Sequence, residues 1–558
     1  MAAPLAGCQR RPAALIMDPV DQAAPRSVDI AILGGGLAGN LLARQLRRTL
    51  PQLSVAVFER SRETSFKVGE STVEIATNYL LRRLGLSTYL YENQLPKNGL
   101  RFFFDTPTRD AAMVDMSEIG SDRLPTFPSF QIDRARLEAD LLRMNAADGV
   151  DIHLGARAHD LHLHEQDGPP EQRTASGMHE FTVTEGEQRY PVRARWVVDA
   201  SGRASAIARL KDLRVPVADH GIAAVWGRFT GHADMDACGP DSWRARVRHT
   251  ARTLSTNHFC YPDYWIWFIP LGRGVMSVGW VGDRAIFRDE MRKPDGFLEF
   301  LRGHRAAWDL LKDGAELVDV LAYKQLAYGT RQFFGGADRW FLTGEAAAFS
   351  DPFYSPGSDF IALENDFITD MIARDHAGES RTQIAERSAV YDEFMQFRLQ
   401  ATMLLYRDLY PVLGSYELLK LKWDFDIACY YNLWAAPYWH DEHLDLKLLQ
   451  GQLRRKDFML QGLANFSSLF QRLEAGFRAR GLTHRANLGR YSCALDIVNF
   501  AEELAAPRPR RQVMRTTEAI FNTIRERALD LLADLGETPT PAERRLPLYD
   551  FLLASPLA

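Results

Sequence analysis

The chain has 558 residues, 46% of them hydrophobic and 25% charged, a composition typical of a globular protein. Its net charge of −5 provides no global positive field, which argues against nucleic acid as a partner and against charge-driven binding to membranes. The five cysteines include no C-x-x-C pair and no clustered His/Cys set, so we expect reduced thiols and no metal site. We expect residues 1–27 to be a disordered leader. Because no run of eighteen apolar residues follows, we expect a cytoplasmic enzyme without a membrane span.

The first predicted elements form a βαβ unit. Residues 28–33 are a β-branched run typical of a buried parallel strand, and residues 40–50 carry apolar side chains at helical spacing. Residues 54–58 repeat the strand pattern and end at Glu59. This order and size are typical of a dinucleotide-binding domain.

A glycine-rich turn joins the first strand to the helix. The first glycine permits the tight turn, Gly36 lets the backbone approach a pyrophosphate, and Gly39 lets the helix pack closely on the strand. The phosphates would lie at the helix N-terminus, and Glu59 would accept hydrogen bonds from ribose hydroxyls. The predicted dinucleotide-binding residues of this unit are Gly34, Gly36, Leu37, Ala38, Gly39 and Glu59.

Further along the chain the pattern changes twice. Residues 133–147 predict an amphipathic helix, and residues 196–199 a buried strand that runs into a small-residue turn. Alternating, aromatic-rich segments at about 205–330 indicate an antiparallel sheet on the substrate side. Residues 340–345 return to the parallel-strand pattern, and residues 366–558 are expected to form a helical C-terminal region covering the substrate pocket.

Two later turns favour FAD over a nicotinamide cofactor. Asp199 begins one of them, and Gly344 and Glu345 form the other, with Glu345 where aspartate is more usual. These turns, spread over residues 28–365, resemble those along the extended FAD of flavoproteins of the para-hydroxybenzoate hydroxylase type. The resemblance implies an α/β (α+β) fold with a Rossmann-like FAD-binding core.

The segment from Trp265 to Pro270 contains W-x-W-x-I-P. It resembles the signature of flavin-dependent halogenases, which share the hydroxylase fold. That resemblance implies that Trp265 and Trp267 line a tunnel and keep the organic substrate away from the flavin. On the residues alone, the same pattern also fits an amphipathic strand whose tryptophans are core.

A second similarity lies at Lys97, downstream of the G-E-S segment at residues 69–71. In the family a lysine in a similar K-x-G setting is buried between flavin and substrate, so Lys97 is the expected catalytic residue. Burial lowers a lysine pKa by disfavouring the ammonium form. The ammonium could hydrogen-bond hypohalous acid, and the neutral amine could form a haloamine; the sequence leaves both open. The resemblance also implies cofactor contacts from Ser71, Arg134 and Pro352.

Residues 351–358 resemble the family's loop beside the flavin ring, where backbone amides hold chloride. Here Pro356 stands where Ser or Thr is usual, and proline has no N–H to donate. We therefore expect Ser355, Gly357 and Ser358 to bind the halide, with chloride and bromide both open.

The same loop bears on the substrate. In halogenases of free tryptophan a glutamate of this loop assists substitution, and the matching residue here is Tyr354. This favours a phenol-type substrate, which activates itself by losing its own proton, and leaves open whether that substrate is free or carrier-bound. The aromatic stretches at residues 430–434 and 438–440 fit either pocket walls or ordinary core.

Three functions are compatible with these residues. The leading one is a two-component halogenase that uses FADH2, oxygen and halide, because no second G-x-G-x-x-G is present and a separate flavin reductase is then expected. The alternative is an FAD-dependent aromatic monooxygenase that hydroxylates its substrate; Pro356 favours it, whereas Lys97 and the two tryptophans disfavour it. The third is a non-catalytic flavoprotein, which Lys97 also disfavours.

Overall fold

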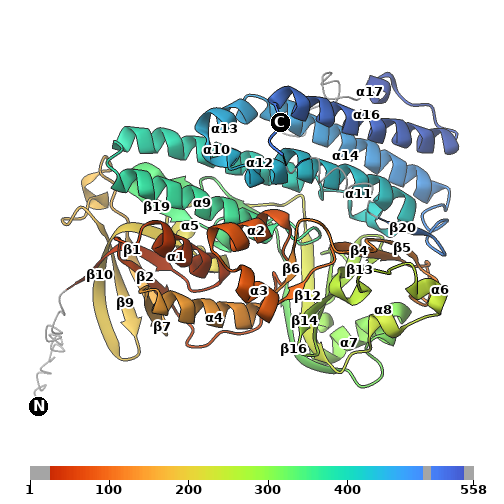
Figure 1. Cartoon of the computed structure of the whole chain (residues 1–558), viewed down its shortest axis with the longest axis horizontal. Coiled ribbons are helices and arrows are strands. Elements are labelled where there is room, and N and C mark those ends of the chain that lie inside the picture. Colours follow the sequence, from red (N-terminus) through yellow and green to blue (C-terminus); the bar gives the residue numbers. More distant parts are fainter. Residues whose placement is uncertain (1–24, 494–503, 505, 546–558) are drawn as a thin grey trace, which may run out of the picture.

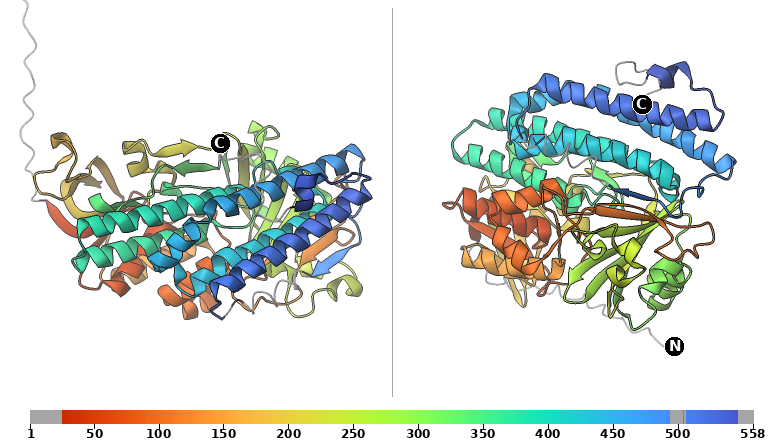
Figure 2. Two further views of the ribbon diagram at one scale, coloured as in Figure 1. Left: turned by 90° about the horizontal axis from the view of Figure 1, so that it is seen from above. Right: turned by 45° about the vertical axis from the view of Figure 1, so that its right-hand side comes forward.

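The computed structural model describes residues 25–493, 504 and 506–545. Two sheets lie next to each other, and the C-terminal helices form a layer over both (Figures 1 and 2). We expected a disordered leader at residues 1–27. Residues 1–24 of it lie outside the described residues, and residues 26 and 27 belong to the first strand.

The first sheet is Rossmann-like. Strand β1 runs parallel to β2 on one side and to β10 on the other, and β19 continues the parallel set beyond β10. Ile30 and Ile32 on β1 are fully buried, as a strand covered on both faces requires. The predicted βαβ unit is therefore confirmed. The strands are β1 (Arg26–Leu33), β2 (Val55–Glu59), β7 (Asp151–Leu154), β8 (Ala156–His162), β9 (His179–Glu185), β10 (Gln188–Asp199), β18 (Phe334–Gly335) and β19 (Trp340–Leu342).

Helices cover this sheet. Helix α1 starts at the glycine turn, and the predicted helix at residues 133–147 is present as α4, with Asp133 as its N-cap accepting from the Arg136 N–H at 3.2 Å. The helices here are α1 (Leu37–Thr49), α2 (Glu74–Asn78), the π-helix η1 (Tyr79–Arg83), α3 (Ser87–Asn93), α4 (Arg134–Ala147) and α5 (Ala206–Leu210).

The second sheet is mainly antiparallel, as predicted, but it reaches beyond residues 205–330. Three of its strands come from elsewhere: β4 and β5 precede that range, and β20 comes from within the C-terminal region. Strand β4 pairs in parallel with β13, and β20 pairs in parallel with β5, so the sheet is mixed. The strands are β4 (Leu100–Phe104), β5 (Ser117–Gly120), β12 (Ile222–Thr230), β13 (Thr256–Tyr261), β14 (Tyr264–Gly272), β15 (Val275–Asp283), β16 (Glu316–Tyr323) and β20 (Tyr491–Cys493).

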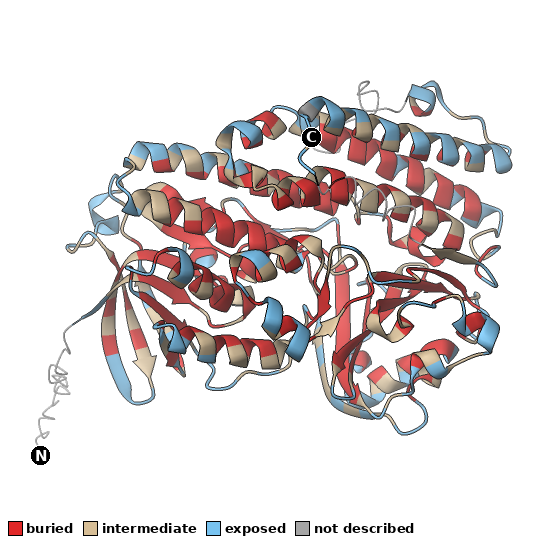
Figure 3. Cartoon of the chain, viewed as in Figure 1, coloured by how far each residue is buried: buried red, intermediate tan, exposed pale blue. Residues whose placement is uncertain are grey.

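Within its described residues, the C-terminal region contains one strand, β20, besides its helices, so the expectation of helices alone was wrong there. A three-residue strand is too short for alternation to show in the sequence. Buried residues fill both sheets and the helix faces that meet them (Figure 3). No helix among the described residues has the length and apolar character of a membrane span. The helices are α9 (Gly357–His376), α10 (Arg381–Met403), α11 (Tyr416–Tyr430), the π-helix η10 (Tyr431–Ala435), α12 (Ala436–Trp439), α13 (Leu446–Leu453), α14 (Lys456–Ala479), α16 (Arg510–Asp534) and α17 (Pro541–Arg545).

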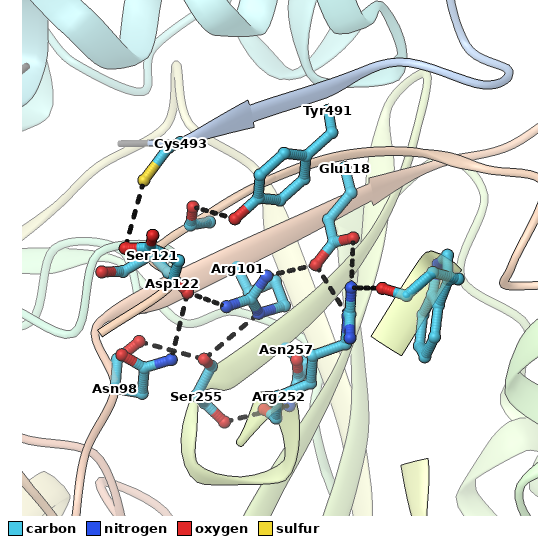
Figure 4. A network of polar contacts seen from close by, with 12 residues as sticks. Asn98, Arg101, Glu118, Ser121, Asp122, Arg252, Ser255, Asn257, Tyr491 and Cys493 are labelled. Atoms are coloured by element: carbon cyan, nitrogen blue, oxygen red, sulfur yellow. Dashed lines mark hydrogen bonds and ion pairs between the residues drawn. The ribbon is translucent and has the colours of Figure 1, made fainter. Parts of the chain in front are cut away.

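A buried Arg–Glu–Arg group ties the second sheet together (Figure 4). Glu118 of β5 bonds Arg101 of β4 and accepts from Arg252, with Nε at 2.9 Å from Oε1 and a terminal nitrogen at 3.1 Å from Oε2. The Arg252 guanidinium also lies 3.5 Å from the centre of the Trp243 ring. One carboxylate thus compensates two fully buried cations.

Replacing Glu118 by Gln removes that compensation. We expect Glu118→Gln to lower the free energy of unfolding by about 3–5 kcal/mol, because two guanidiniums stay buried without a counter-charge. Denaturant unfolding measures this. Glu299→Gln, which removes the exposed partner of Arg302, is the matched control and should change little. Equal stability of the two variants would contradict the assignment.

Candidate active site

The glycine turn leaves room for a phosphate in one place only. A side chain at Gly34, where φ is +116°, would put Cβ 2.3 Å from the Ala200 oxygen, and one at Gly39 would meet the Gly34 oxygen at 2.0 Å. A Cβ at Gly36 would meet no atom within 4 Å. Gly34 and Gly39 are therefore needed for packing, whereas Gly36 faces open space at the start of α1, where an anion is favoured.

Glu59 closes the turn from the end of β2. Its Oε2 accepts the Gly35 N–H at 2.7 Å, and its Oε1 accepts the Ser61 N–H at 2.8 Å. Each carboxylate oxygen keeps a further lone pair, which is what a ribose hydroxyl would need. The turn and Glu59 together fit the adenosine half of FAD.

A cavity beside this turn collects most of the other predicted cofactor and halide residues. It lies where the loop after β19 meets α9 and β14. The predicted residues that line it are Leu37, Ser71, Arg134, Trp265, Trp267, Gly344, Glu345, Pro352, Ser355, Gly357 and Ser358. We call this space the flavin-side cavity.

Besides Glu59 and the three glycines of the turn, Asp199, Ala38 and Pro270 do not line the flavin-side cavity. Asp199 is fully buried, and its carboxylate accepts the Ser201 and Ile207 N–H groups at 2.9 and 2.7 Å, so it holds the turn after β10. Ala38 packs against Gly344, and Pro270 lies where the pairing of β14 with β15 shifts register. Direct contact of these three residues with the cofactor or the tunnel stays a prediction.

The tryptophans of the W-x-W-x-I-P strand are buried and form part of the cavity wall. The Trp267 indole N–H donates to Ser277 Oγ at 3.1 Å, and that of Trp265 donates to the Tyr410 hydroxyl at 3.4 Å. Any Cβ at Gly279 of β15 would lie 2.2 Å from the Trp267 ring, so this glycine makes the space that the ring occupies.

A second cavity, of about 1200 Å³ including its mouth, lies on the other side of the loop. Lys97 lines it together with Tyr354 and the aromatic residues Tyr430, Tyr431 and Trp434. We call it the lysine cavity. The first of the two predicted aromatic stretches is thus a cavity wall.

The second aromatic stretch is not. The Tyr438 hydroxyl donates to Asp366 at 3.0 Å, and Trp439 stacks on Phe127 with ring centres 4.0 Å apart. Neither residue lines the lysine cavity.

Lys97 is almost fully buried, with 1% of its surface exposed. Its ammonium donates to the Thr72 carbonyl at 2.8 Å. Burial lowers the pKa of Lys97 to about 8, and the nearby carboxylates Glu74 and Asp359 oppose that shift. At neutral pH the side chain is mainly an ammonium.

Sequence reasoning missed these two carboxylates. Asp359 is fully buried; its Oδ1 accepts the Ala76 N–H at 2.8 Å, its Oδ2 accepts the Tyr430 hydroxyl at 3.0 Å, and burial raises its pKa to about 7. Glu74, at the start of α2, accepts the Tyr431 hydroxyl at 2.6 Å. A signal was available, since Glu74 lies three residues after Ser71 and Asp359 directly follows the loop.

Tyr354 lines the lysine cavity in place of the carboxylate of the tryptophan-type loop. Its hydroxyl donates to Asp426 at 2.7 Å, and Asp426 is also paired with Lys422. This carboxylate is therefore held behind Tyr354.

The two cavities share Pro356, which lines both. The next two residues, Gly357 and Ser358, line the flavin-side cavity, and the third, Asp359, lines the lysine cavity. Within the described residues, the N–H groups of Gly357 and Ser358 have no hydrogen-bond partner, as expected in the first turn of a helix. The preceding Ser355 has φ of +58°, which turns the chain into α9.

Comparison with known proteins agrees with this geometry. A family model described as an FAD binding domain matches residues 27–254. The chain is a flavoprotein. The flavin-dependent halogenase chlA of Dictyostelium discoideum is 29% identical over 445 residues, covering 75% of this chain and 71% of chlA. A 1H-pyrrole-2-carbonyl peptidyl-carrier protein chlorinase of Pseudomonas fluorescens is 24% identical, covering 59% of this chain and 72% of the chlorinase.

Solved structures share the fold. Halogenase PltM, solved in complex with phloroglucinol and FAD, is 18% identical with a TM-score of 0.64, covering 94% of this chain and 99% of PltM. The flavin-dependent brominase Bmp2 is 19% identical with a TM-score of 0.56, covering 81% of this chain and all of Bmp2. Together these comparisons support the flavin-dependent halogenase family and bear out the predicted fold class and FAD cofactor.

The glycine turn yields a test of cofactor binding. We expect Gly36→Ala to leave the stability of the FAD-free protein unchanged, because its Cβ meets no atom, and to weaken FAD binding by about tenfold or more, because the methyl group keeps a phosphate from the backbone. Flavin fluorescence titration measures the affinity.

Gly39→Ala is the contrasting variant. Its Cβ would collide with the Gly34 oxygen, so it should lower stability as well as FAD binding. Unchanged FAD affinity in Gly36→Ala would contradict the phosphate position.

Proposed function

We propose that this protein halogenates an electron-rich aromatic substrate, a phenol, with hypohalous acid that passes from the flavin-side cavity to Lys97. The observation that carries the proposal is the shared wall at Pro356. On one side lies an FAD-binding framework, and on the other a buried lysine faces a cavity lined by aromatic rings. Bound reduced FAD, with oxygen and halide, would supply the hypohalous acid.

The halide would bind at the start of α9. The Gly357 and Ser358 N–H groups remain available there, and the helix dipole favours an anion at this end. The Ser355 hydroxyl would complete the site. Pro356 lacks an N–H but only adjoins the two donors, so its presence does not remove them.

The cofactor would be held by the glycine turn, Glu59, Ser71, Arg134 and the turn at Gly344. Trp265 and Trp267 would separate the organic substrate from the flavin, because both lie on the wall of the flavin-side cavity. A separate flavin reductase would supply FADH2, as flavin-dependent halogenases generally require.

Lys97 would act as an ammonium. Glu74 and Asp359 stabilise that form, and an N–H of the ammonium would donate to the oxygen of hypohalous acid while the halogen points into the lysine cavity. The substrate would lie against Tyr354 and the tyrosines of α11 and η10. The phloroglucinol in the PltM complex is a phenol, which supports this substrate class.

The alternative, an aromatic hydroxylase, is less supported. Hydroxylation by a flavoenzyme needs the substrate beside the flavin, whereas here the aromatic cavity is on the far side of Pro356. The named relatives are halogenases as well.

The activity can be tested with bromide and resorcinol. Purified protein with FAD, a flavin reductase, NADH and oxygen should give bromoresorcinol, detected by mass spectrometry. We expect Lys97→Met to lower product at least 100-fold while FAD binding is retained, because the buried cation that holds the oxidant is lost. Hydroxylated resorcinol as the main product, or bromination that survives in Lys97→Met, would refute the proposal.

The ammonium role also predicts a pH dependence. Because the pKa of Lys97 is about 8, the ammonium fraction falls as the pH rises through 8. Bromination per FADH2 consumed should therefore be highest below pH 8 and decrease above it. A yield that rises steadily from pH 8 to pH 9 would favour the neutral amine and a haloamine instead.

A further inference from the structure

Three acidic side chains line the lysine cavity within the described part of the chain. They differ in whether a carboxylate oxygen is free to accept a hydrogen bond or a proton from a ligand. Asp359 has both oxygens bonded to protein donors and no exposed surface. Asp426 is bonded to Lys422 and to Tyr354 through one oxygen, and its other oxygen is buried out of reach. Neither presents a free oxygen to a bound molecule.

Glu74 is different. It is partly exposed to the cavity, and Oε1 accepts the Tyr431 hydroxyl at 2.6 Å. The Tyr430 hydroxyl and the backbone N–H of Glu74 also act on this carboxylate and lower its pKa, but no described residue donates a well-aligned hydrogen bond to Oε2. The carboxylate is therefore oriented by one bond and keeps one oxygen for a ligand.

Its surroundings suit a proton acceptor. Glu74 interacts with the Lys97 ammonium, which faces the same cavity. Burial raises the pKa of Glu74 above its ordinary value, although Tyr431 and Lys97 oppose that shift. A carboxylate with a raised pKa is a stronger base than one in water. The π-helix η10 starts at Tyr431, directly after Tyr430, and both hydroxyls reach carboxylates of the cavity.

We propose that Glu74 is the general base that removes the hydroxyl proton of a phenolic substrate in the lysine cavity. The inference rests on the proposed function and specifies its substrate class: a ring bearing an ionisable hydroxyl. Tyr431 is then a positioning residue, which fixes Oε1 so that Oε2 points to the substrate.

With bromide as the halide, hypobromous acid brominates the ring. The phenol proton passes to Glu74, and the phenolate ring carbon forms a C–Br bond as the O–Br bond of hypobromous acid breaks. Bromine is reduced by two electrons and the ring is oxidised by two. The departing hydroxide takes a proton from the Lys97 ammonium to form water. The ring hydrogen then leaves as a proton to the Lys97 amine, and Glu74 returns its proton to the product oxygen.

Glu74→Gln tests the proposal, because the amide oxygen still accepts from Tyr431 but cannot take a proton. At pH 7 we expect bromoresorcinol per FADH2 consumed to fall about 100-fold, with hypobromite formation, measured by taurine trapping, at the wild-type rate. The ratio of Glu74→Gln to wild-type yield should rise about tenfold per pH unit between pH 7 and 9, because a phenol of pKa about 10 ionises increasingly by itself.

Whether this yield ratio rises or falls with pH distinguishes base catalysis by Glu74 from an indirect effect of its charge on Lys97. Loss of the Glu74 charge would by itself lower the pKa of Lys97, which would make the ratio fall as the pH rises. Resorcinol dimethyl ether is a matched probe, because it has no hydroxyl proton. Glu74→Gln should lower its bromination only through the weaker stabilisation of the Lys97 ammonium, and therefore far less than that of resorcinol. Asp359→Asn should not show the pH-dependent rescue, and Tyr431→Phe should lose less activity than Glu74→Gln.

Two results would overturn the assignment: wild-type resorcinol yield in Glu74→Gln with an unchanged pH profile, or an equal loss with resorcinol dimethyl ether. Absence of trapped hypobromite in the wild-type protein would instead refute the proposed function. The two failures are therefore distinguishable.

Discussion

The first turn of α9 is the constraint on which the site depends. Pro356 is common to two cavities, the next two residues face the flavin-side cavity, and Asp359 faces the lysine cavity. A helix turns by about 100° per residue, so one turn presents successive residues to both sides of a thin wall. Among the described residues, the same turn has N–H groups without a partner on the side where a halide would be needed, and a carboxylate on the side where Lys97 lies. Under the proposed function, this geometry would place the formation and the use of the oxidant in adjoining spaces.

The two sheets hold that turn in place. The Rossmann-like sheet fixes the loop after β19, and the second sheet brings β14 and its tryptophans against the same loop. Glu70 and Arg228 form a buried ion pair, 2.6 Å between Oε1 and a guanidinium nitrogen, that joins the segment before Ser71 to β12. The Arg101–Glu118–Arg252 group lies close to Lys97 in sequence and space, since Asn98 is bonded to Ser121 and Ser255 of the same network (Figure 4). Lys97 thus lies in the short connection before β4, next to a residue that this network anchors.

Local patterns in the sequence predicted the parts of the fold that are local. Helix α1 is amphipathic and α4 begins at a capping aspartate, Asp133, so both helices and the strands of the βαβ unit could be placed to within about three residues. Strand β20 could not, because its three residues are fixed by pairing with β5, which lies more than 300 residues away. Asp199 has the expected place at the end of β10, but its carboxylate is used by two backbone amides. Glu74 and Asp359 have no motif of their own; they become neighbours of Lys97 only when α2, α9 and the segment before β4 come together.

The separation of the two cavities is most directly tested by locating the halide. A crystal grown with FAD and bromide, measured at the bromine absorption edge, gives the bromide position from anomalous scattering. We expect one bromide at the start of α9, within hydrogen-bond distance of the Gly357 or Ser358 N–H and on the flavin side of Pro356. A bromide bound instead beside Lys97, or none at α9, would contradict it.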